Sequence, residues 1–66
     1  MKNNIRVLRA IKHITQAELS EMIQVSRQTI NTIESGKYVP STVLALKMAR
    51  VFAVPVEEIF ELDPED

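Results

Sequence analysis

Four polar side chains between residues 27 and 32 could hydrogen-bond the edges of DNA bases. If this segment is a helix, Arg27, Asn31, Gln28 and Thr32 fall on one arc, at about 0°, 40°, 100° and 140°. Arg pairs well with guanine, Gln and Asn with adenine, and Thr with a polar edge or a thymine methyl group. Because the arc holds a base and no acid, we predict that these four residues contact bases in the major groove.

Short helices with clear boundaries would position this arc. Thr15 and Glu18 have the spacing of a capping box, which starts a helix. Ser26 is a good N-cap for the next helix, and Gly36 suits the left-handed residue that follows a helix end. Two short helices separated by a turn, over about residues 16–35, predict a helix-turn-helix.

Three further helices make the predicted fold all-α, with five helices in total. A basic amphipathic helix is expected from Asn4 to Ile14, a fourth helix from Ser41 through Phe52, and a short fifth from Pro55 to near Phe60. In the first helix, the apolar side that we expect to face the core contains Val7, Leu8, Ala10, Ile11 and Ile14. Arg6, Arg9, Lys12 and His13 fall on its opposite side. The extended ends of the chain allow a short antiparallel pairing.

Charge is divided unevenly along the chain. Residues 1–50 hold eight Lys and Arg against three Glu, a net of +5, whereas residues 51–66 hold six Asp and Glu and no base, a net of −6. The overall charge of −1 is therefore no argument against a polyanionic partner. We expect the basic part to face DNA and the acidic tail to point away.

Size and composition exclude several classes. The 66 residues predict one domain, residues 1–66, without cysteine and with a single histidine, so no disulfide, metal site or cofactor is expected. No apolar run approaches the ~20 residues of a membrane span, and no signal peptide is apparent, which indicates a cytoplasmic protein. No nucleophile, base and orienting group come together, so an enzyme is not expected. Nothing indicates a small-molecule effector.

An ordered set of residues between 4 and 60 resembles the lambda-repressor-like helix-turn-helix family of Cro and phage repressors, and in particular its short stand-alone repressors of the cytolysin-operon type. The matching residues are Ile5, Leu8, Arg9, Gln16, Ala17, Glu18, Leu19, Ile23, Val25, Ser26, Ile30, Ile33, Glu34, Gly36, Lys37, Pro40, Ser41, Ala49, Phe52, Val54, Glu58 and Ile59. Two positions depart from the family: Gln24 stands where Gly is usual at the turn, and Ser20 where Ala is preferred. A left-handed residue other than Gly costs about 1 kcal/mol.

The resemblance implies two further roles. Arg9 and Glu34 would form a structural ion pair between the first and third helices. Residues around Lys37 would hold a DNA phosphate, as would Gln16 at the start of the second helix, where amides and dipole favour anions. A packing role for Tyr38 is the alternative to a phosphate contact. The full set of predicted phosphate contacts is Gln16, Ser26, Ser35, Lys37 and Tyr38.

The fourth helix carries more apolar residues than one core-facing stripe needs. We therefore predict a homodimer whose interface lies within about residues 43–62. The expected interface residues are Val43, Leu44, Val51, Pro55, Val56 and Ile59. A two-fold dimer would place two reading helices in half-sites about 34 Å apart on a palindromic operator.

The sequence thus predicts a homodimeric transcription regulator that binds double-stranded DNA. Repression is expected rather than activation, because no activation or effector domain follows the helix-turn-helix. Two alternatives stay open. One is the antitoxin of a toxin–antitoxin pair. The other is a protein-interaction module with a relict helix-turn-helix, whose apolar patch and acidic tail bind a partner.

Overall fold

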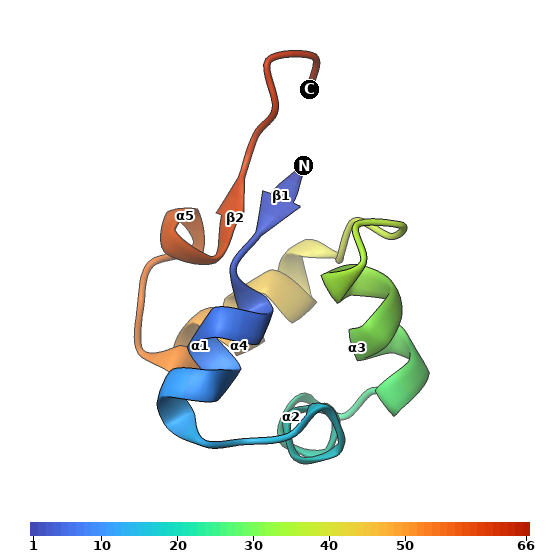
Figure 1. Ribbon diagram of the computed structural model, residues 1–66, viewed down its shortest axis with the longest axis vertical. Coiled ribbons are helices and arrows are strands. Elements are labelled where there is room, and N and C mark those ends of the chain that lie inside the picture. The colour runs from blue at the N-terminus through green and yellow to red at the C-terminus, as the bar shows by residue number, and fades with distance from the viewer.

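The computed structural model describes residues 1–66 and shows five helices around one core, with a short strand at each end of the chain (Figure 1). The helices are α1 (Ile5–Lys12), α2 (Gln16–Ile23), α3 (Arg27–Glu34), α4 (Thr42–Phe52) and α5 (Val56–Ile59), and the strands are β1 (Lys2–Asn3) and β2 (Phe60–Glu61). The five-helix, helix-turn-helix fold and the pairing of the two ends are as predicted.

Serine and threonine side chains start the helices where the sequence predicted. The Thr15 hydroxyl accepts from the Glu18 amide at 3.0 Å, and the Glu18 carboxylate accepts from the Thr15 amide at 2.8 Å. Ser26 and Ser41 cap α3 and α4 in the same way, each accepting from the amide three residues ahead. These contacts fix where each helix begins because they satisfy amides that lack a partner within the helix.

Residues in the left-handed conformation end three helices: His13 ends α1, Gln24 ends α2 and Ala53 ends α4. Gln24 also forms the turn between α2 and α3. Gln24 has φ of 61°, although it carries a side chain. Lys47 of α4 supports this turn: its Nζ donates to the Ile23 carbonyl at 3.4 Å and to Gln24 Oε1 at 3.5 Å. A cation at the end of α2 is favourable, because the last carbonyls of a helix carry partial negative charge.

The core draws on every helix and on β2. Nine apolar residues are buried in one cluster: Ile5, Leu19, Ile23, Ile30, Ile33, Met48, Phe52, Ile59 and Phe60. Leu8, Ile14, Leu44 and Val51 pack against it from partly buried positions. The inner sides of α2 and α3 thus sit on the same core as α4, which holds the helix-turn-helix as a rigid unit.

The predicted inward face of α1 was wrong in part: Leu8 and Ile14 pack against the core, but the other three residues of that side are exposed. Val7 and Ile11 are 58% and 65% exposed, whereas Ile5 is buried. The helix is rotated from the orientation that periodicity predicted because Arg9 turns inward to pair with Glu34 of α3, as the family resemblance implied. It also ends two residues earlier than expected, because His13 adopts the left-handed conformation.

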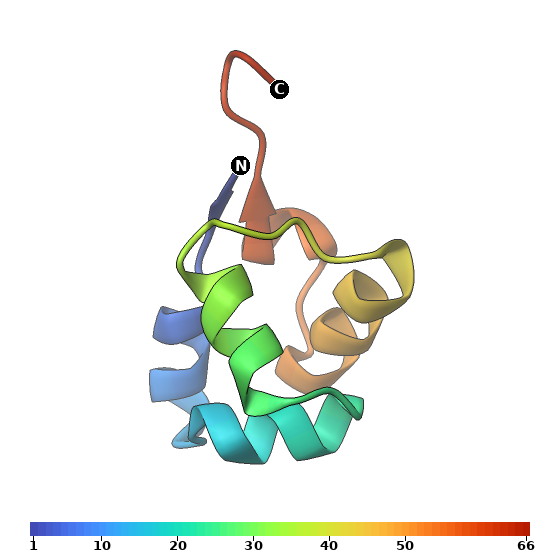
Figure 2. The same ribbon diagram turned by 90° about the vertical axis from the view of Figure 1, so that its right-hand side faces the viewer.

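The two ends of the chain lie together, at the end of the molecule opposite α2 (Figures 1 and 2). β1 and β2 pair antiparallel, with Lys2 opposite Glu61 and Asn3 opposite Phe60. The Asn3 side chain also donates to the carbonyls of Ile33 at 3.1 Å and Glu34 at 3.4 Å. The terminal pairing therefore reaches the end of α3 and supplies it with a cap.

None of the five helices combines the length and the apolar character that crossing a bilayer requires.

Candidate nucleic-acid interface

The four predicted base-contacting residues lie on the side of α3 away from the core, and the helix itself is at the front of the view in Figure 2. Arg27, Gln28 and Asn31 are exposed and Thr32 is half-buried. On the opposite side of the helix, Ile30 and Ile33 are buried in the core. The same packing that holds α3 in the protein therefore turns its polar arc outward.

Gln16, at the first position of α2, connects this arc to the rest of the domain. Its Oε1 accepts from Arg27 Nε at 3.5 Å, and its Nε2 donates to Asn31 Oδ1 at 3.4 Å and to Glu34 Oε1 at 3.0 Å. The structure thus brings a predicted phosphate contact and two predicted base contacts into one hydrogen-bonded group. Side chains held in one arrangement by such bonds lose less conformational entropy when they bind a ligand.

Arg9 and Glu34 form the expected ion pair between α1 and α3. Arg9 Nε lies 2.6 Å from Glu34 Oε2, and Arg9 Nη2 donates to Oε1 at 3.1 Å, so the pair is bidentate. The Glu34 side chain is 1% exposed and that of Arg9 15%. Arg9 Nη1 also reaches the Ile14 carbonyl at 3.3 Å. The pair is therefore structural, and it anchors Gln16 through the second bond to Glu34 Oε1.

The surroundings of Glu34 keep its carboxylate charged. Burial alone would raise the pKa of Glu34, but hydrogen bonds from Arg9 and Gln16, with the nearby charges of Arg9 and Arg6, outweigh this and hold the pKa below its ordinary value. Arg6 lowers this pKa least, because its Nε lies 3.8 Å from Glu34 Oε1 and its side chain is mostly exposed. At neutral pH, Glu34 is thus a fixed negative charge beneath the polar arc of α3.

A polar hollow of about 550 Å³ opens at the start of α2. It is lined by Arg9, Ile14, Thr15, Gln16, Ala17 and Arg27. Arg27 lines the hollow together with the first residues of a helix, whose free amides attract anions, whereas the charge of Arg9 is paired with Glu34. This arrangement suits a DNA phosphate at the position predicted for Gln16.

The other predicted phosphate contacts are spread along α3 and the loop after it. The Ser26 hydroxyl accepts from the Thr29 amide at 3.1 Å, and the Ser35 hydroxyl donates to the Thr32 carbonyl at 2.9 Å. Both hydroxyls are thus already bonded within the helix. Lys37 is exposed and takes part in no ion pair, so its charge is available to a phosphate. Tyr38 is exposed beside α3.

The predicted interface residues do not share one exposed face. Val43 and Pro55 are exposed, Leu44, Val51 and Val56 are half-buried against the core, and Ile59 is completely buried. The Ile59 side chain belongs to the core cluster, and its carbonyl accepts from the Asn4 amide at 2.8 Å, which ties α5 to the start of α1. Exposed apolar side chains gather instead around a groove beside α4.

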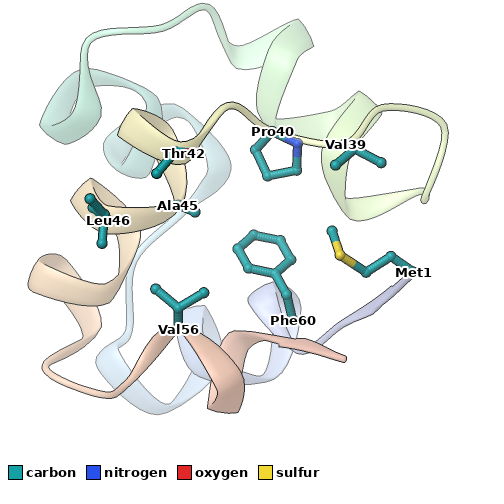
Figure 3. Close-up of a pocket in the computed structure, with 8 residues that line it drawn as sticks. All are labelled: Met1, Val39, Pro40, Thr42, Ala45, Leu46, Val56 and Phe60. Carbon is teal, nitrogen blue, oxygen red and sulfur yellow. The ribbon is translucent and has the colours of Figure 1, made fainter. Parts of the chain in front are cut away.

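This groove has a volume of about 380 Å³ and mostly apolar walls (Figure 3). Its lining is formed by Met1, Val39, Pro40, Thr42, Ala45, Leu46, Val56 and Phe60. The Phe60 ring points into it from β2 and faces Pro40, while Leu46 stands at its edge on α4. Val39 and Leu46 are exposed, so the groove and its rim form one continuous apolar surface.

Some residues that support or line the candidate interface were not predicted. Lys47 and Asn3 cap α2 and α3 from elements distant in sequence, and no local pattern indicates such contacts. Thr29 lines a hollow on α3 together with Gln28, Thr32 and Tyr38. Its place in the first turn of α3, directly after Gln28, was the one available indication.

Comparison with known protein families matches residues 5–59 to the Helix-turn-helix family. The match spans the five helices and the hydrogen-bonded face just described. The chain belongs to the lambda-repressor-like helix-turn-helix family.

Several curated relatives in this family align with the chain along its length. An uncharacterized HTH-type transcriptional regulator of Methanocaldococcus jannaschii is 46% identical over 66 residues and covers all of both chains. The uncharacterized HTH-type transcriptional regulator YgzD of Bacillus subtilis is 44% identical, also over the whole of both chains. One from Archaeoglobus fulgidus is 46% identical over all of this chain and 93% of its own.

Proposed function

We propose that the protein is a sequence-specific DNA-binding transcription regulator, and that it acts as a homodimeric repressor on a palindromic operator. Family membership and the names of the relatives support the DNA-binding regulator. The observation that carries the proposal is the hydrogen-bonded face of α2 and α3, in which Gln16 joins Arg27 and Asn31. Repression follows if the operator overlaps a promoter, because the bound protein then occupies the groove that other proteins need.

The reading face has the residues needed for both parts of DNA recognition. Arg27, Gln28, Asn31 and Thr32 lie together on α3 and offer donors and acceptors to base edges. Arg27 in the hollow at the start of α2, the free amides of that helix and the exposed Lys37 can attract the phosphates of the backbone. Phosphate contacts set register and affinity, and base contacts set sequence preference.

Dimerisation through the apolar groove is the second part of the proposal. The proposed interface keeps Val43, Pro55 and the partly exposed Val56 from the predicted set. Within the same region it adds Leu46 and Phe60, and outside that region it adds Val39. Leu44, Val51 and Ile59 contribute by holding this surface in shape from the core side. Apolar surface gathered around one groove is typical of protein–protein contact.

Selection from random DNA duplexes tests the function directly. We expect purified protein to enrich one consensus with two-fold symmetry, and half-sites separated by about one helical turn. Affinity for it should fall linearly on a log–log plot against salt, with a slope near −0.9 for each phosphate neutralised. Enrichment of no consensus would refute sequence-specific binding, and a consensus without symmetry would refute the two-fold dimer.

A further inference from the structure

The outer face of α3 carries two hollows of opposite character. One, of about 250 Å³, has polar walls formed by Gln16, Arg27, Gln28 and Asn31. The other, of about 260 Å³, is lined by Gln28, Thr29, Thr32 and Tyr38, and most of its exposed lining is carbon. Gln28 borders both. The polar hollow suits hydrogen bonds to bases. The apolar hollow cannot serve that purpose, so it must have a different role.

The threonine hydroxyl groups around the apolar hollow are already bonded to residues of α3 or to its N-cap. Thr29 Oγ1 and Ser26 Oγ are 2.9 Å apart and share a hydrogen bond. Thr32 Oγ1 donates to the Gln28 carbonyl at 2.8 Å and accepts from Gln28 Nε2 at 3.3 Å. The methyl groups of the two threonines and the ring of Tyr38 are therefore the groups left to form the wall.

The major groove of unmodified DNA offers one apolar group on its base edges, the C5-methyl of thymine. We propose that the hollow of Thr29, Thr32 and Tyr38 receives a thymine methyl group and makes the protein select thymine there. This inference rests on the proposed function. Residues four apart on a helix are separated by about 6 Å along its axis, and neighbouring bases on one strand by about 3.4 Å. The thymine therefore lies within about two base pairs of the base that Gln28 contacts.

The experiment starts from the duplex selected by the protein and replaces its thymines one at a time by deoxyuridine, which removes only the methyl group. We expect one thymine in each half-site to be sensitive, with affinity falling about fourfold on replacement, as burial of one methyl group predicts. Replacement of thymines outside the half-sites is the control and should leave affinity unchanged.

Variants of Thr32 then assign the methyl contact to this hollow. Thr32→Ser keeps the hydroxyl that bonds to Gln28 but removes the methyl group, so it should abolish the difference between the thymine and deoxyuridine duplexes. Thr32→Val keeps the methyl group and removes the hydroxyl, so the fourfold difference should persist. Tyr38→Ala, at an exposed position, should also reduce the difference, and Tyr38→Phe should not.

The outcomes separate this inference from the function on which it rests. A selected consensus that is insensitive to deoxyuridine, or whose sensitivity is unchanged in Thr32→Ser and Tyr38→Ala, would overturn the methyl pocket while leaving sequence-specific binding intact. Equal losses in Tyr38→Ala on both duplexes would assign Tyr38 to the sugar–phosphate backbone instead. Selection of no consensus would overturn both proposals.

Discussion

The surface of α2 and α3 differs in kind from the surface formed by α4, the loop before it and β2. On α2 and α3, exposed polar side chains bond to one another, as Gln16 does to Arg27 and Asn31. Around α4, the exposed side chains include Val39 and Leu46, which border a groove with apolar walls. The first surface is organised by the protomer itself, whereas the second leaves apolar groups in water until another molecule covers them. The proposed DNA binding and the proposed dimerisation therefore use separate parts of the fold.

The largest effect is expected from removing the ion pair beneath the first surface. Arg9→Ala leaves the carboxylate of Glu34, which is 1% exposed, without its counter-charge. Breaking a buried pair in this way costs about 3–5 kcal/mol of the free energy of unfolding. Urea denaturation followed by circular dichroism measures it. The matched control is Arg6→Ala, which removes an exposed guanidinium 3.8 Å from the same carboxylate and should change stability by less than about 0.5 kcal/mol. Similar losses in both variants would contradict the structural role of Arg9.

The second surface is tested by placing a charge on its rim. Leu46→Glu should raise the dimer dissociation constant about thirtyfold, because an unpaired carboxylate would be buried between the two copies. Sedimentation equilibrium measures this change. Val7→Glu is a closely matched control, since Val7 and Leu46 are both 58% exposed in the protomer but Val7 lies on α1, outside the groove. A dimer weakened by Val7→Glu and not by Leu46→Glu would move the interface to α1.

Gln28→Ala should have an intermediate effect that depends on the DNA used. The loss should be about 1–3 kcal/mol on the selected duplex and little on random DNA, because a base contact carries sequence preference. Fluorescence anisotropy with both duplexes measures it. Glu57→Ala, at an exposed position on α5, serves as the control and should bind both as the parent does. Equal losses on the two duplexes would make Gln28 a positioning residue.

The last and smallest expected effect is the change in the Glu34 contribution to stability as the solution is acidified. Its pKa is lowered from an ordinary value of 4.5, so the stability it contributes is complete above that pH and is lost as the pH falls through the folded-state pKa. The difference in unfolding free energy between the parent and Glu34→Gln should therefore be constant from pH 7 to about 5 and shrink below about 4.5. Urea denaturation across this range measures it, and a difference that stays constant into acid would exclude a charged Glu34 as the source.

Local interactions explain why much of the fold was predictable. A capping hydroxyl and a partner three residues ahead are enough to start a helix, so Thr15, Ser26 and Ser41 were identified from the sequence alone. The left-handed positions at Gln24 and Gly36 were also expected. Helix caps and the glycine after α3 require only neighbouring residues. The family resemblance supplied the turn at Gln24 and the pairing of Arg9 with the distant Glu34.

Predictions that depend on which side of a helix faces the core were less successful. Periodicity gave α1 an apolar side, but its orientation is set by the bond from Arg9 to a residue 25 positions away. The same limit applies to the second surface. The apolar excess of α4 was evident, yet whether Leu44 or Leu46 is exposed depends on how α4 sits on the core. The hollow at Thr29 requires the loop containing Tyr38 to fold back beside α3, which no local pattern indicates.

The bonds from Asn3 to the last carbonyls of α3 have a consequence for folding order. The strand that holds Asn3 pairs with Phe60, so this cap is complete only when nearly the whole chain has closed into a ring. Contacts between residues so distant in sequence form late, because closing a long loop must precede any gain from the contact. A nascent or partly unfolded chain therefore lacks this cap, and the last turn of α3 gains it only in molecules whose two ends have paired.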